Sequence, residues 1–238
     1  MRARRPANTV VAPTTSIVLD GFPGSANSFA REAVLYCNPD ASVASHIHTS
    51  AHLMEGLRLG KPSVLLVRPP VDAIVSFLSR GYRSELEGAL HAYDRLHRRM
   101  IRHLDRFVVA PFDRTTQRFG DVVDEVNMRF GTTFVPFPHE DREARDAVFA
   151  RLEAYTRTVA GDDAELLQAT PTDSRKARQA EVRAVLLEPG FDRLRTRCEE
   201  LYAHVCSAAP DLTRVVRLPE PAPGRPALTP AGAVATAV

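Results

Sequence analysis

Short apolar runs alternate with longer segments of mixed polarity through the middle of the chain. The runs are rich in β-branched residues and bounded by turn residues, as buried strands are: Ser16–Phe22, Ser42–His48, Ser63–Arg68 and Phe107–Phe112. The segments between and after them repeat apolar residues every three or four positions, as helices do: Ser25–Leu35, Ala51–Leu59, Pro70–Arg80, Glu85–His103 and Gly120–Phe130. This alternation predicts an α/β fold with right-handed crossovers and a parallel sheet flanked by helices.

The two ends of the chain differ from this middle part. Three further helices, each charged on one face, are predicted to cap the sheet and close a ligand cleft: Arg142–Thr158, Ser174–Leu187 and Gly190–Cys206. Residues 1–13 have the composition of a loose arm, and residues 218–238 are rich in Pro, Ala and Gly, so both are predicted to be disordered. A single domain over residues 14–217 is expected.

Composition narrows the function classes. The 238 residues are 44% hydrophobic and 25% charged, which is typical of a soluble globular protein that holds its core without disulfides or a metal. A net charge of +2 is too small for a nucleic-acid partner. No apolar run approaches the roughly 18 residues of a membrane span, and the N-terminus lacks a signal-peptide core. Three cysteines without a C-x-x-C pair indicate a reducing compartment, so a cytoplasmic protein is expected.

The segment Gly21–Ser28 follows the first predicted strand and opens a helix. In such a place backbone N–H groups and the helix dipole can hold a phosphate. Compared with the Walker A pattern, Ala26-Asn27-Ser28 stands where Gly-Lys-Ser/Thr should be, so an ATPase or GTPase would lack its phosphate lysine. The alternative is an ordinary Gly/Ser turn in which Ser25 caps the helix.

A second phosphate half-site is indicated further along the chain. Arg68 ends the third apolar run, and Pro70 stands where the next helix starts, a position that favours proline. Arg68 and Ser76 can converge on one phosphate, the first through a bidentate charged contact and the second through its hydroxyl. In the alternative, Arg68 only pairs with Asp72 in the first helical turn.

Together these segments resemble the sulfotransferases that use 3′-phosphoadenosine-5′-phosphosulfate (PAPS). Arg68–Ser76 is similar to their 3′-phosphate motif, R-[DN]-P-x-D-x-x-x-S, and Gly21–Phe29 is similar to their 5′-phosphosulfate loop, [YF]-P-[KR]-S-G-[ST]-[ST]-[WFL]. The resemblance extends over Phe107–Gly131 and, more weakly, over Thr172–Arg178. It implies a three-layer, P-loop NTPase-like α/β fold.

The resemblance also implies roles for particular residues. It assigns the 3′-phosphate to Arg68 and Ser76, with Ser174 and Arg175 as further ligands. The 5′-phosphosulfate would be held by the loop residues Gly24, Ser25, Ala26, Asn27 and Ser28. The family carries a lysine or arginine at the position of Gly24, where it stabilises charge on the departing oxygen. Arg31 is the nearest candidate in the sequence to replace that cation.

Three histidines lie between the two motifs, and sulfuryl transfer to an alcohol needs a base of their kind. His46-Ile47-His48 is similar to the family's K-[TS]-H, which implies His48 as general base and His46 at the lysine position. Residues two apart on a strand share a face, so both are expected to address one cleft. The alternatives are a zinc site formed with His52, or imidazoles that only satisfy backbone groups.

The function implied is transfer of a sulfuryl group from PAPS to a hydroxyl of a small-molecule or carbohydrate acceptor. Adenosine 3′,5′-bisphosphate (PAP) is the expected product, and no metal is required. Two alternatives stay open at this point: a non-catalytic nucleotide-binding or scaffold protein that kept the fold after losing the loop cation, and a P-loop kinase of small molecules. The sequence indicates neither the acceptor nor the oligomeric state.

Overall fold

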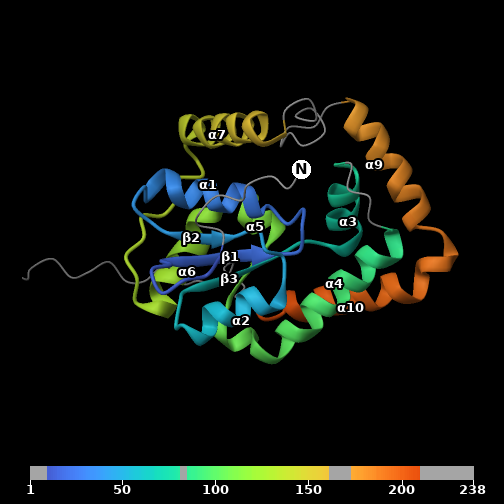
Figure 1. Ribbon diagram of the computed structural model, residues 1–238, viewed down its shortest axis with the longest axis horizontal. Coiled ribbons are helices and arrows are strands. Elements are labelled where there is room, and N and C mark those ends of the chain that lie inside the picture. The colour runs from blue at the N-terminus through green and yellow to red at the C-terminus, as the bar shows by residue number, and fades with distance from the viewer. Residues whose placement is uncertain (1–9, 81–84, 161–172, 210–238) are drawn as a thin grey trace, which may run out of the picture.

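The computed structural model describes residues 10–80, 85–160 and 173–209 (Figure 1). The predicted tail over residues 218–238 and most of the predicted N-terminal arm lie outside them. Of that arm, Val11 is buried in the core. Within the described residues, no helix has both the length and the apolar character to cross a membrane.

Four parallel strands form one sheet, in the order β2-β1-β3-β4. They are β1 (Ile17–Gly21), β2 (Val43–Ser45), β3 (Ser63–Val67) and β4 (Val108–Pro111). All four coincide with predicted apolar runs, and the predicted α/β class with an all-parallel sheet is confirmed. In this order the connection from β1 to β2 and the connection from β3 to β4 run in opposite directions from the middle of the sheet. The loops that follow β1 and β3 therefore lie next to each other at the carboxyl edge.

Helices cover both faces of the sheet. Their bounds are α1 (Asn27–Cys37), α2 (Ser50–Arg58), α3 (Pro70–Leu78), α4 (Leu86–Met100), α5 (Phe112–Gln117), α6 (Phe119–Phe130), α7 (Arg142–Ala160), α9 (Asp173–Leu186) and α10 (Asp192–Cys206), with 3-10 turns η1 (Ile101–Arg106) and η3 (Pro189–Phe191). Side chains of alternate residues along each strand enter opposite core clusters. Val18 and Leu65 pack on the side of α2, α4 and α10, whereas Leu19 and Leu66 pack on the side of α1, α6 and α7.

Two predicted strand ends are wrong, and both errors bear on the site. The second strand stops at Ser45, because His46 and His48 have left-handed backbones with φ of 63° and 58°. The fourth strand stops at Pro111, and Phe112 begins the short helix α5. The polar residues after these strands therefore belong to connections at the carboxyl edge of the sheet, where ligands of open α/β sheets bind.

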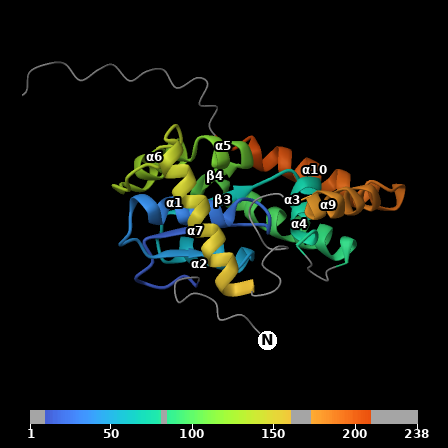
Figure 2. The ribbon, with the colours of Figure 1, turned by 90° about the horizontal axis from the view of Figure 1, so that it is seen from above.

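The predicted closing helices are divided between two places. In both views α7 crosses above α1, whereas α3, α4 and α9 gather at the other side of the molecule (Figures 1 and 2). Arg183 of α9 pairs with Asp72 of α3 and fastens these two helices together. Helix α9 thus packs on α3, the helix that follows β3.

Candidate functional site

The loop after β1 and the arginine after β3 are in direct contact. Nη1 of Arg68 donates a hydrogen bond of 2.9 Å to the carbonyl oxygen of Gly24. Gly24 has a φ of +86°, and a Cβ added there would lie 2.7 Å from the carbonyl oxygen of Ala73 and 3.4 Å from Oγ of Ser76. The two segments that the sequence assigned to opposite ends of one nucleotide therefore share a single surface.

The loop after β1 contains buried polar atoms that have no hydrogen-bond partner within the described residues. Ser25 is fully buried, and its hydroxyl has no hydrogen-bond partner within the described residues. The expected alternative, Ser25 as helix cap, is wrong: the cap residue of α1 is Ala26, in a left-handed conformation with φ of 64°, and no side chain caps the helix. Nδ2 of Asn27 donates 3.0 Å to the carbonyl of Phe22 and braces the turn. No side chain caps the first N–H groups of α1, and such groups can bind an anion.

Arg68 is held in place by uncharged partners. Its guanidinium lies over the ring of Phe112, 3.9 Å from the ring centroid. Its backbone carbonyl accepts a 2.7 Å hydrogen bond from the hydroxyl of Tyr93. The carboxylate of Asp72 pairs with Arg183 of α9, so the local pair with Arg68 that the sequence left open does not form. The guanidinium of Arg68 is therefore oriented toward the loop at Gly24.

Helix α9 adds a second arginine, and this one is buried. Arg175 is only 5% exposed, whereas the neighbouring Ser174 is exposed at the start of α9. Burial, together with the charges of Arg80 and Arg68, lowers the pKa of Arg175 to about 10. Since Arg183 lies about two helical turns further along α9 and contacts the start of α3, the two helices run antiparallel. This arrangement sets Arg175 beside the end of α3.

Arg80 is a site residue that sequence reasoning missed. It stands two positions after the end of α3 and four positions after Ser76. Its charge acts on Arg68, Arg175 and His46. The spacing from Ser76 was the signal that could have identified it. Arg31, the cation proposed from the sequence, pairs instead with the carboxylate of Glu32.

Asp20, at the end of β1, organises the connection that carries the histidines. Its fully buried carboxylate accepts hydrogen bonds from the backbone N–H groups of Gly21 at 2.9 Å, Ile47 at 3.2 Å and His48 at 3.0 Å, and from Nδ1 of His52 at 2.6 Å. Burial alone would raise the pKa of Asp20, but the bonds from His48 and His52 outweigh it and hold the pKa well below its ordinary value. Asp20 is therefore a permanent anion beneath the site.

His48 has the geometry of a base with a fixed tautomer. Its Nδ1 lies 2.8 Å from the carbonyl oxygen of Gly21 and 3.2 Å from Oδ1 of Asp20. Because both of these oxygens only accept, Nδ1 carries a proton, and in the neutral imidazole the lone pair is therefore on Nε2. The side chain is 25% exposed, so a ligand can reach it.

The other two histidines are directed elsewhere. His46 bonds Ser28 through Nε2 at 2.9 Å and Ser45 through Nδ1 at 2.8 Å, and its ring lies 5.7 Å from that of His48. Burial, with a further contribution from His48, lowers the pKa of His46 to about 4, so it is neutral at pH 7 and brings no positive charge. His52 is buried on Asp20. Among the described residues, no His, Cys, Asp or Glu cluster could hold a metal ion.

Acid should destabilise the protein through two buried histidines. Burial lowers the pKa of both His46 and His97 to about 4, against 6.5 in the unfolded chain. Between these values the unfolded chain binds more protons, so the free energy of unfolding falls as pH drops from 6.5 to 4, by up to about 1.4 kcal/mol per pH unit for each histidine. Urea titrations at several pH values measure this slope. His97→Gln should make it shallower, and an unchanged slope would contradict the assignment.

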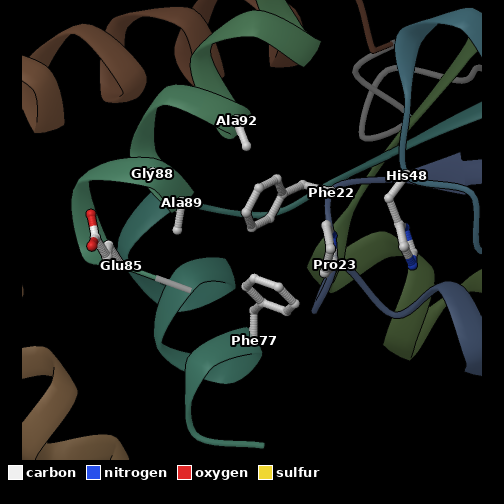
Figure 3. Close-up of a pocket in the computed structure, with 8 residues that line it drawn as sticks. All are labelled: Phe22, Pro23, His48, Phe77, Glu85, Gly88, Ala89 and Ala92. Atoms are coloured by element: carbon white, nitrogen blue, oxygen red, sulfur yellow. The ribbon is translucent and has the colours of Figure 1, made fainter. Parts of the chain in front are cut away.

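A cavity of about 430 Å³ opens beside His48 (Figure 3). Its walls come from the loop after β1, the connection after β2, the last turn of α3, and the start of α4 with the residue before it: Phe22, Pro23, His48, Phe77, Glu85, Gly88, Ala89 and Ala92. Phe77 follows Ser76 directly, so adjacent positions of α3 serve the cavity and the Gly24 loop. The cavity and the arginine surface are therefore neighbouring parts of one site.

Comparison of the chain with protein-family models finds no match, and comparison with curated proteins finds no significant match. The resemblance to sulfotransferases is thus carried by the motif positions themselves. Of these, the structure brings Gly24, Ser25, Arg68 and Ser76 together at one sheet edge, with Arg175 beside them.

Proposed function

We propose that this protein is a PAPS-dependent sulfotransferase with a P-loop NTPase-like fold, which moves a sulfuryl group to a hydroxyl of an acceptor bound beside His48. The observation that carries the proposal is the contact between Arg68 and Gly24. It makes one continuous anion-binding surface of the phosphate loop and the second half-site, with an imidazole of fixed tautomer at its border.

The residues present suit a bisphosphorylated nucleotide. The buried hydroxyl of Ser25 and the first N–H groups of α1 would hold the 5′-phosphosulfate. Arg68, Ser76 and Arg175 would hold the 3′-phosphate, and an anion there would relieve the repulsion between the two arginines. When bound, PAPS supplies the activated sulfuryl group.

The chain's own contribution to the chemistry is proton transfer and charge stabilisation. Nε2 of His48 accepts the proton of the acceptor hydroxyl while Nδ1 stays bonded to Gly21. The imidazolium that results is stabilised by the anionic carboxylate of Asp20, 3.2 Å from Nδ1. This arrangement needs no other base.

The missing loop cation is replaced from α3 in this proposal. A Cβ added to Gly24 would lie 2.7 Å from the carbonyl oxygen of Ala73, so the loop is too close to α3 for a side chain at this position. The family has a lysine or arginine at the same position. Arg80 follows the end of α3, and its charge reaches both His46 beside Ser28 and Arg175. We assign to Arg80 the stabilisation of charge on the leaving group.

Titration with PAP tests the proposal directly. The wild-type protein should bind PAP, and Arg68→Ala should weaken binding by about 10- to 100-fold, because a charge-assisted hydrogen bond contributes about 1.5–3 kcal/mol. Arg142→Ala is the matched control, since Arg142 is 87% exposed on α7, and it should bind as the wild type does. Absence of PAP binding by a folded wild-type protein would refute the proposal.

A second candidate function is suggested by Gly24 and the neutral His46, which leave the loop itself without a cation. The protein would then bind the nucleotide without turning it over. In that case PAP titration succeeds, but transfer of labelled sulfate from PAPS fails across acceptor panels. Arg80→Ala distinguishes the two functions, because only in a sulfotransferase does it lower a transfer rate.

A further inference from the structure

Most of the described side chains that line the cavity beside His48 are apolar. The rings of Phe22 and Phe77 meet edge to face, with centroids 5.9 Å apart, and Ala89 and Ala92 of α4 complete the wall. Among the lining residues that the structure describes, only His48 and Glu85 have side-chain nitrogen or oxygen atoms. A sugar would leave most of its hydroxyl groups without partners against such walls, and each buried unpaired hydroxyl is unfavourable.

The two polar residues lie at opposite ends of the cavity. Figure 3 shows His48 at one end, Glu85 at the other, and the rings of Phe22 and Phe77 between them. Glu85 is exposed at the residue that precedes α4, and no ion pair within the described residues engages its carboxylate. The cavity thus has a proton acceptor at one end and a negative charge at the other.

The aromatic wall of the cavity is connected to Arg68 through Tyr93. Phe22 packs against Tyr93, with ring centroids 5.2 Å apart, and the hydroxyl of Tyr93 donates to the carbonyl of Arg68. Phe22 is only 3% exposed, so its ring cannot turn away to admit a bulkier, polar ligand. The apolar character is therefore built into the fold.

We infer that the cavity takes a flat, mostly apolar phenol or alcohol, with its hydroxyl at His48 and a positively charged group favoured at the Glu85 end, and that it rejects sugars. A volume of about 430 Å³ accommodates a ring with a short side chain. This inference deepens the proposed function and rests on it for the role of the hydroxyl.

Three probes test the chemistry of the cavity in the PAP-saturated protein. Tyramine carries a phenol and an ammonium group, 4-ethylphenol lacks the charge, and methyl β-glucoside is a sugar of similar size. Calorimetric titration should give affinities in the order tyramine, 4-ethylphenol, glucoside, with about tenfold or more between the phenols and the sugar. Glu85→Gln should bring tyramine to the affinity of 4-ethylphenol.

Gly88 offers a matched pair of variants. A Cβ added there meets nothing within 4 Å, so alanine fits without disturbing the packing, and both alanine and leucine form helix better than glycine. Gly88→Leu projects into the cavity and should weaken binding of both phenols by about tenfold or more, whereas Gly88→Ala should leave it nearly unchanged. PAP affinity should stay the same in both variants.

Equal or tighter binding of the glucoside, or phenol binding that Gly88→Leu leaves intact, would overturn the inference. If the wild-type protein bound tyramine no more tightly than 4-ethylphenol, the role given to Glu85 would be wrong. If the wild type binds the phenols but not PAP, the proposed function fails while the chemistry of the cavity stands. The two failures are therefore separable.

Discussion

Replacing His48 with asparagine is expected to lower the rate of sulfuryl transfer by about 10²- to 10⁴-fold, the usual contribution of a general base. Asparagine is the suitable replacement because His48 has a φ of 58°, and asparagine tolerates that left-handed conformation better than most residues. It cannot take up the proton at neutral pH. Single-turnover transfer from labelled PAPS to a phenol measures the loss.

The matching control separates chemistry from binding. PAP affinity should be unchanged in His48→Asn, because His48 contacts Gly21 and Asp20 rather than the arginine surface. His204, an exposed histidine of α10, provides the comparison variant His204→Asn, which should transfer at the wild-type rate. A transfer rate that survives in His48→Asn would assign the proton to another group.

Asp20→Ala is expected to lower the free energy of unfolding by about 3–5 kcal/mol. The substitution removes one buried carboxylate and leaves several donors without an acceptor, including the backbone N–H of His48 and Nδ1 of His52. It also releases the connection in which His46 and His48 adopt left-handed conformations, which few non-glycine residues hold without support. Chemical denaturation at pH 7 measures the change.

An exposed aspartate serves as the reference for that experiment. Asp146 on α7 is 70% exposed, and Asp146→Ala should change the free energy of unfolding by no more than about 0.5 kcal/mol. If Asp20→Ala behaved like Asp146→Ala, the carboxylate would not be the element that holds the histidine connection. A heat-stable Asp20→Asn would point to hydrogen bonding rather than charge as the main contribution.

The sheet and the meeting of Arg68 with the Gly24 loop could be predicted from sequence because they depend on local signals. Buried parallel strands are short apolar runs, and Arg68 and Gly24 each stand where such a run ends. Parallel strands bring their carboxyl ends to one edge, so segments distant in sequence meet there. Periodicity and position were sufficient for this part.

The remaining site residues depend on contacts that periodicity does not record. Asp20 sits within an apolar run and shows its role only when Ile47 and His48 fold over it. Arg80 and Arg175 become neighbours only because α9 lies antiparallel on α3. The second strand ends early at His46, which has a left-handed backbone. A hydrogen bond to Ser28, 18 residues earlier in the chain, holds His46, and the local sequence does not predict such a contact.

The position of Tyr93 sets a rule for redesigning the cavity. Its ring supports Phe22 and stacks on His97, and its hydroxyl fixes the carbonyl of Arg68. In the proposed sulfotransferase, enlarging the cavity by truncating Tyr93 would therefore also weaken nucleotide binding at Arg68. Substitutions at Gly88 and Ala92, in the first turns of the same helix, would change the choice of acceptor and leave binding of the proposed donor unchanged.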